Sequence, residues 1–211
     1  MILVCFAVKE EAGAFKRMAG SRANVLTLLT GMGKANAERA IRGALESRKP
    51  GLVLSCGFAG GLRADLASGT VVFAADGQTE LESALTNAGA RPAKFHCSER
   101  VASTVGAKGA LRDTTGADAV EMESQIICGI CQEQKIPCAI VRVILDTADE
   151  DLPLDFNALM TADQRMDYGK LAMALIRAPG KIGGLLRLQK QSREAAEKLA
   201  EVLERITFNH G

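Results

Sequence analysis

The sequence is poor in aromatic residues and in histidine. Aromatic residues make up 4% of the 211 residues, tryptophan is absent, and the only histidines are His96 and His210. The core must therefore be built from Ala, Val, Ile, Leu and Met. Two distant histidines also provide little material for a zinc site, so we expect no metal. No bound organic cofactor is implied by the sequence either.

The sequence also lacks a net charge of either sign. It has 26 Lys and Arg against 25 Asp and Glu, a formal charge of +1, which gives no general reason to bind nucleic acid or a membrane surface. The apolar start, Met1 to Val8, has no basic leader and is too short to span a bilayer, so we expect no stable membrane insertion. A small-molecule partner is favoured.

The positions of the cysteines favour reduced thiols over a disulfide framework. Most of the six lie inside apolar runs, which is typical of reduced core thiols in a cytoplasmic protein. Cys128 and Cys131 form a CxxC, but the pattern around them predicts a helix that turns both inward. Redox chemistry remains an alternative that would require a thiol of low pKa. The cysteines are Cys5, Cys56, Cys97, Cys128, Cys131 and Cys138.

Apolar runs alternate with helical patterns through most of the chain. This alternation predicts one α/β domain over residues 1–211, with a three-layer α/β/α architecture and a mixed, mostly parallel sheet. The expected strands are 2–8, 25–29, 52–56, 71–74 and 138–145, and the expected helices are 35–47, 80–88, 103–111 and 124–134. Two further helices are expected at 162–176 and 189–206, separated by breaks at Pro179-Gly180 and Gly183-Gly184.

Acidic residues stand at or just past the ends of three strand-like runs. They occur in Ala7-Val8-Lys9-Glu10-Glu11, in Val120-Glu121-Met122-Glu123 and in the run from Val141 to Asp146. Active sites of α/β proteins gather outside the carboxyl ends of strands, so we expect these carboxylates to converge.

Two glycine-rich stretches follow expected strands, Thr30 to Lys34 and Gly57 to Leu62. Glycines there let a ligand approach the backbone, but neither stretch has the spacing of a dinucleotide fingerprint or of a P-loop. The candidate anion-binding residues are Gly31, Gly33, Lys34 and Arg63.

Taken in order, these motifs resemble the nucleoside phosphorylase family, and most of all the branch that contains methylthioadenosine/S-adenosylhomocysteine nucleosidase. The resemblance runs from residue 2 to about residue 160 and implies cleavage of a purine N-glycosidic bond. It implies that Asp146 protonates the base and that Glu123 binds the ribose hydroxyls above Met122. It also implies that Glu11, rather than its neighbour Glu10, activates water. Glu121 is expected to be structural.

The nucleophile and the substrate remain open. The hexameric phosphorylases bind phosphate with arginines that have no match here, which favours hydrolysis, whereas Arg63 and Lys34 keep phosphorolysis as an alternative. A non-catalytic nucleoside-binding protein is a third alternative. Other expected substrate contacts are Gly57 and Phe58, Val101 in place of a base-stacking aromatic, and Phe156 beside the 5′ group.

The short length and the tail resemble the hopanoid-associated phosphorylases, which are thought to remove adenine from adenosylhopane. A shortened segment before Val120 would leave room for a long apolar 5′ group. The run from Arg177 to Arg187 is the candidate contact with a membrane-borne substrate, and an ordinary connection between helices is the alternative. The family resemblance further implies a homo-oligomer, in the first place a dimer.

Overall fold

The computed structural model describes residues 1–211 except 21, 76, 162, 165, 210 and 211, and only the backbone of 208 and 209. Within these residues eight strands form one mixed sheet in the order β2-β1-β3-β8-β4-β5, with β7 paired to β3 and β6 to β7. The strands are β1 (Ile2–Phe6), β2 (Val25–Leu29), β3 (Leu52–Gly61), β4 (Val71–Ala74), β5 (Arg91–Pro92), β6 (Phe95–Cys97), β7 (Ala119–Glu121) and β8 (Cys138–Asp146).

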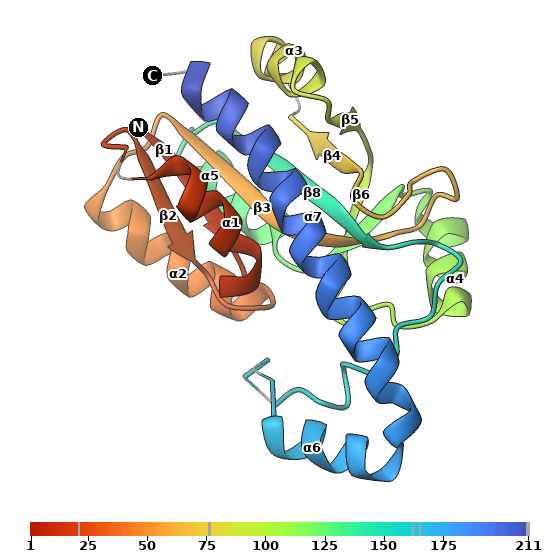
Figure 1. Ribbon diagram of the computed structural model, residues 1–211. Helices are drawn as coiled ribbons and strands as arrows, with labels where there is room; N and C mark the ends of the chain where they lie inside the picture. Colours follow the sequence, from red (N-terminus) through yellow and green to blue (C-terminus); the bar gives the residue numbers. More distant parts are fainter. Residues whose placement is uncertain (21, 76, 162, 165, 210–211) are drawn as a thin grey trace.

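Helices cover both faces of the sheet. Alternate residues of the buried strand β1 point to opposite sides, so that both faces are apolar and need to be covered. Ile2, Val4 and Phe6 pack toward α1, α3 and α7, whereas Leu3 and Cys5 pack toward α2 and α5. In Figure 1, α1 and α7 cross the same face of the sheet. The helices are α1 (Lys9–Ala19), α2 (Lys34–Ser47), α3 (Thr79–Asn87), α4 (Val105–Thr115), α5 (Ser124–Glu133), α6 (Tyr168–Arg177), the 3₁₀ turn η1 (Pro179–Lys181) and α7 (Ile182–Asn209).

This architecture confirms the predicted three-layer α/β/α fold with a mixed, mostly parallel sheet. Antiparallel pairing occurs where β4 meets β8 and where β7 meets β3, and the other named strand pairs are parallel.

The long strand β3 changes its neighbour half-way along. Its first half pairs with β1, which ends at Phe6, and its last residues, Gly60 and Gly61, pair with β7 instead. The register with β8 shifts between Ala59 and Gly60. The end of β1, the middle of β3, the end of β7 and the end of β8 are thus brought together around one region.

Several sequence predictions were wrong in detail. The glycine stretch Gly57–Gly61 is part of β3 rather than a loop, since residues 57–60 pair with β8 and residues 60 and 61 pair with β7. No helix was predicted for α1. The expected break at Gly183-Gly184 does not occur, because α7 runs through both glycines from Ile182. Helix α6 begins at Tyr168, and residue 162, where it was expected to begin, lies outside the described residues.

Candidate active site

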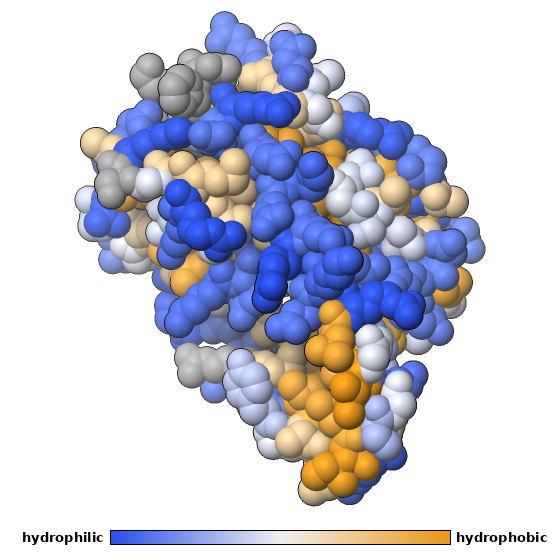
Figure 2. Space-filling view, in the orientation of Figure 1, coloured by the Kyte–Doolittle hydropathy of each residue, from blue (hydrophilic) through white to orange (hydrophobic). Residues whose placement is uncertain are grey.

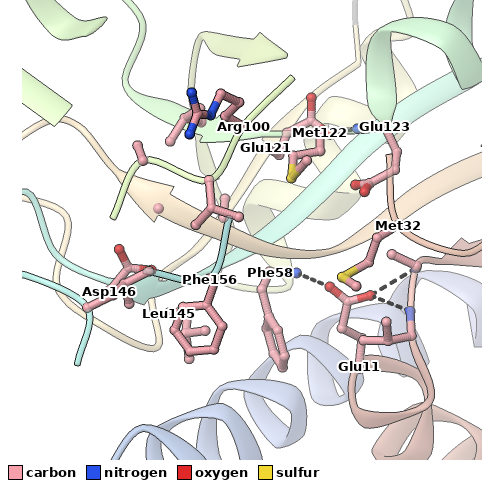
Figure 3. A pocket seen from close by; sticks show the side chains of 18 of the residues that line it. Glu11, Met32, Phe58, Arg100, Glu121, Met122, Glu123, Leu145, Asp146 and Phe156 are labelled. Atoms are coloured by element: carbon pink, nitrogen blue, oxygen red, sulfur yellow. Dashed lines mark hydrogen bonds between the residues drawn. The ribbon is translucent and has the colours of Figure 1, made fainter. Parts of the chain in front are cut away.

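A cavity of about 300 Å³ lies where β3 exchanges β1 for β7, at the carboxyl ends of β1 and β8. Three acidic side chains of the predicted site line it: Glu11, Glu123 and Asp146. Figure 3 shows Glu11 and Glu123 at one end of this pocket and Asp146 at the other, with the rings of Phe58 and Phe156 between. The residues that line it come mainly from strand ends and loops, together with Glu11 on α1 and Leu188 on α7; a site at strand ends is what an α/β protein predicts.

Glu11 occupies the third position of α1 and folds back over the start of its own helix. Its Oε2 accepts hydrogen bonds from the N–H groups of Ala7 (2.9 Å) and Val8 (3.1 Å), and its Oε1 accepts one from Phe58 (2.8 Å). Burial raises the pKa of this carboxyl, although the charge of Arg142 and the three N–H donors oppose the shift. Glu10, its neighbour in the sequence, is exposed.

Glu123 shares a buried cluster with Glu121 and the guanidinium of Arg142. Its Oε1 accepts from the Gly33 N–H at 2.9 Å, and its Oε2 lies 3.5 Å from Arg142 Nη2. Burial, only partly offset by Arg142, raises the pKa of Glu123 to about 7. A proton on this group is therefore exchangeable near neutral pH, and the ionised form can accept hydrogen bonds from sugar hydroxyls.

The pKa of Glu121 is shifted in the opposite direction to that of Glu123. Its Oε2 lies 2.6 Å from Arg142 Nη2 and accepts from the N–H groups of Glu123 and Ser124, and its Oε1 accepts from Ser124 Oγ. Burial disfavours its charge, but Arg142 and these hydrogen bonds together lower its pKa. Glu121 therefore holds Arg142 and the start of α5 in place, as its expected structural role requires.

Asp146 ends β8 and forms an ion pair with a fully buried lysine. Lys108 Nζ, from α4, lies 2.6 Å from Asp146 Oδ2 and also donates to the carbonyls of Thr147 and Glu150, each at 2.6 Å. Burial raises the pKa of Asp146, and the charge and hydrogen bond of Lys108 oppose that shift. An acid of raised pKa is suited to giving up a proton to a leaving group.

The other expected contacts divide into two groups. Met122, Phe58, Val101 and Phe156 line the cavity with the three acids. Gly57 instead leaves room for the site. Its φ of +149° disfavours other residues, and an added Cβ would lie only 2.5 Å from Glu11 Oε1 and from Arg142 Nη1.

The expected anion-binding residues are not gathered at one place. The Gly33 N–H is already used by Glu123, whereas Lys34 lines a neighbouring hollow with Arg39 and Arg100. Gly31 does not line the cavity in the described part of the chain. Arg63 pairs with Asp65 and with Asp118 away from the cavity.

Sequence reasoning missed Arg142, Lys108 and Arg100. Arg142 had a visible signal, an arginine within the apolar strand β8, where a charge is rarely found without a partner. Lys108 had no such signal in the sequence, because a lysine on a helix of mixed polar and apolar residues is ordinarily exposed. The larger apolar residues missed at the cavity wall include Met32, Leu145, Leu152, Met160, Met166 and Leu188.

The fold and this pocket define an α/β protein with a buried acidic site at the carboxyl ends of its strands. The family model described as the phosphorylase superfamily matches residues 7–98 and 80–177. The chain belongs to the phosphorylase superfamily, which confirms the family expected from its motifs.

Individual relatives agree with this assignment. The chain is 41% identical over 44 residues to an aminodeoxyfutalosine nucleosidase of Helicobacter pylori, a match that spans 21% of this chain and only 19% of that relative. The structure resembles the futalosine hydrolase of H. pylori (TM-score 0.66, 15% identity, 96% of both chains). It also resembles the methylthioadenosine/S-adenosylhomocysteine nucleosidase of Neisseria meningitidis (TM-score 0.65, 19% identity, 96% and 98%). At these identities the structural matches show the shared fold.

The raised pKa of Glu123 predicts how the stability of the fold changes with pH. Because the folded pKa of about 7 exceeds the unfolded value of 4.5, this group stabilises the fold fully below about pH 4.5, and that contribution is lost as the pH rises through about 7. We expect the melting temperature of Glu123→Gln to fall less than that of the wild type between about pH 5 and about pH 8. The exposed Glu10→Gln is the control, and parallel curves for all three proteins would contradict the burial argument.

Proposed function

We propose that this protein hydrolyses the N-glycosidic bond of an adenine nucleoside that carries an apolar 5′ substituent. The observation that carries the proposal is the division of the pocket, with Glu11 and Glu123 at one end and Asp146 at the other. Cleavage of this bond builds positive charge on the ribose and negative charge on the departing base, so it needs anions at the sugar and an acid at the base.

Each acid has a role that its surroundings support. Asp146 donates its proton to the purine, Glu123 accepts hydrogen bonds from the ribose hydroxyls, and Glu11 orients and deprotonates the attacking water. The three backbone N–H groups hold the Glu11 carboxylate in one position, as a base that must aim at a water requires. The nucleosidases among the relatives support hydrolysis, and no cofactor enters this scheme.

The apolar wall of the pocket supports the proposed 5′ group. Besides Phe156 the cavity is lined by Leu152, Met160, Met166 and Leu188, side chains that offer an alkyl or thioether group an apolar surface. A methylthio group fits this chemistry, and so does the longer apolar group of adenosylhopane, the substrate suggested by the resemblance to hopanoid-associated phosphorylases.

Phosphorolysis of the same bond is the second candidate, and it rests on Arg100. This residue lines both the acidic cavity and the neighbouring hollow that holds Lys34 and Arg39, so a phosphate could be held beside the ribose. The anionic form of Glu11 would repel a phosphate dianion, which is why hydrolysis is the leading proposal.

The test is adenine release from methylthioadenosine, from adenosine and from an adenosine with a long 5′-alkyl chain, each with and without phosphate. Release without phosphate is expected, faster for the two substrates with apolar 5′ groups. We expect Glu11→Gln to reduce hydrolysis far more than any release that depends on phosphate, with Glu10→Gln as the matched control. Release that requires phosphate would establish a phosphorylase, and no release from any substrate would favour a non-catalytic binding protein.

Lys108 provides a second test of the acid. Its charge lowers the pKa of Asp146, so Lys108→Met should raise that pKa and move the basic limb of the pH profile of kcat/KM to higher pH. The control is Lys94→Met, because Lys94 Nζ also donates to a backbone carbonyl, that of Thr115, but on the exposed surface. An unmoved basic limb in Lys108→Met would argue that Asp146 is not the acid.

Assembly is a further part of the proposal. We expect a homodimer, which light scattering on a sizing column measures directly.

A further inference from the structure

A hairpin formed by α6, η1 and the first turns of α7 extends away from the body of the molecule (Figure 1). We call residues 168–193 the basic hairpin. None of the residues of α6 is buried. Of the eight exposed large hydrophobic residues among the described residues, five belong to this hairpin, and Figure 2 shows an apolar surface gathered on the same lobe. They are Tyr168, Met173, Ile176, Ile182 and Leu186.

The basic hairpin also carries an excess of positive charge relative to the rest of the chain. Residues 168–193 include six basic residues and no acidic residue, and since the whole chain carries +1, the remainder carries −5. All six are exposed, and among the described ion pairs only Lys190 has a partner, Glu194 at 3.6 Å. The six are Lys170, Arg177, Lys181, Arg187, Lys190 and Arg193.

We propose that the basic hairpin docks on the surface of an anionic lipid bilayer. Exposed Ile, Leu, Met and Tyr beside Lys and Arg on helices are the features of an interfacial element, in which apolar side chains enter the headgroup region and cations pair with lipid phosphates. Docking here is peripheral, because no helix in the described part of the chain has the length and apolarity needed to cross a membrane.

A bilayer accounts for the charge better than a second copy of the chain does. A two-fold symmetric contact through the hairpin would place the same patch on both sides, so that six cations faced six cations. An anionic lipid surface complements both the charge and the exposed apolar side chains.

The hairpin is continuous with the wall of the active-site cavity. Leu188 lies on α7 within the hairpin, Met166 lies two residues before α6, and both line the cavity. Docking would therefore bring this apolar wall of the pocket close to the lipid surface. If the proposed function holds, an apolar 5′ group could pass from the bilayer into the pocket along this wall.

The experiment is flotation of the full chain with vesicles of phosphatidylcholine alone and of phosphatidylcholine mixed with phosphatidylglycerol. We expect binding to the mixed vesicles that weakens as salt rises, and little binding to the neutral ones. The variant Arg177→Gln/Lys181→Gln/Arg187→Gln should bind about a hundredfold less tightly, since each cation near such a surface contributes about fivefold. The variant Ile176→Ser/Ile182→Ser/Leu186→Ser should lose at least tenfold.

The control variant is Lys16→Gln/Arg48→Gln/Lys49→Gln, which removes the same charge from exposed positions on α1 and beside α2. Retained binding in this control supports the hairpin, whereas equal weakening of both charge variants, or no binding by the wild type, overturns the proposal. Sedimentation of the serine variant is the last arm: loss of a dimer would assign the apolar patch to a second copy instead. Flotation requires no turnover, so its outcome does not depend on the proposed activity.

Discussion

Replacing Asp146 with Asn is expected to lower kcat/KM for adenine release by about 10² to 10⁴, the usual contribution of a positioned general acid. Asparagine has nearly the same shape, and its oxygen can still accept from Lys108, whose Nζ lies 2.6 Å from Asp146 Oδ2. What is lost is the proton that the purine receives as the glycosidic bond breaks. Binding of a non-hydrolysable nucleoside, measured by calorimetry, should change far less than turnover.

The matched control is Asp149→Asn. Asp149 lies three residues further along the same segment, is exposed, and contacts Thr147 Oγ1 rather than the cavity. It should retain the activity of the wild type. If Asp146→Asn were as active as Asp149→Asn, the acid would have to be sought elsewhere in the pocket.

The three acids of the site could be predicted from the sequence, because each follows an apolar run that is recognisable as a strand. Strand ends of an α/β sheet lie at a common edge, so local pattern and general topology were enough to predict that these acidic segments converge. The choice of Glu11 over Glu10 and of Glu123 over Glu121 depended on the family resemblance. Their partners could not be predicted in the same way. Lys108 reaches Asp146 from α4 and Arg142 reaches Glu121 from β8, contacts that depend on how distant elements pack.

The errors in the fold have a similar cause. Gly57 to Gly61 has the composition of a loop, but pairing with β7 and β8 makes it the end of β3. Gly183 and Gly184 are weak helix formers, yet α7 continues through them, and Gly184 lies so close to Pro153 that a Cβ would come within 2.9 Å of its ring. In both places a contact made by the tertiary structure outweighs the local preference of glycine.

The largest loss of stability is expected from Arg142→Leu. The Arg142 guanidinium is fully buried, lies 2.6 Å from Glu121 and 3.5 Å from Glu123, and its charge also favours ionisation of Glu11. Removing it leaves buried carboxylates without compensation, which costs about 3–5 kcal/mol in the free energy of unfolding. Chemical denaturation at neutral pH measures this directly.

Two comparisons separate this charge effect from a simple packing defect. Arg63→Leu removes an arginine that also has two acidic partners, but on the surface, and should cost at most about 1 kcal/mol. The lowered pKa of Glu121 means that its stabilising interaction is present above its unfolded pKa and is lost as the pH falls. The difference between Arg142→Leu and the wild type should therefore shrink in acid. A loss that stayed constant with pH would indicate that Arg142 matters for the volume it fills rather than for the charge that holds the acidic site together.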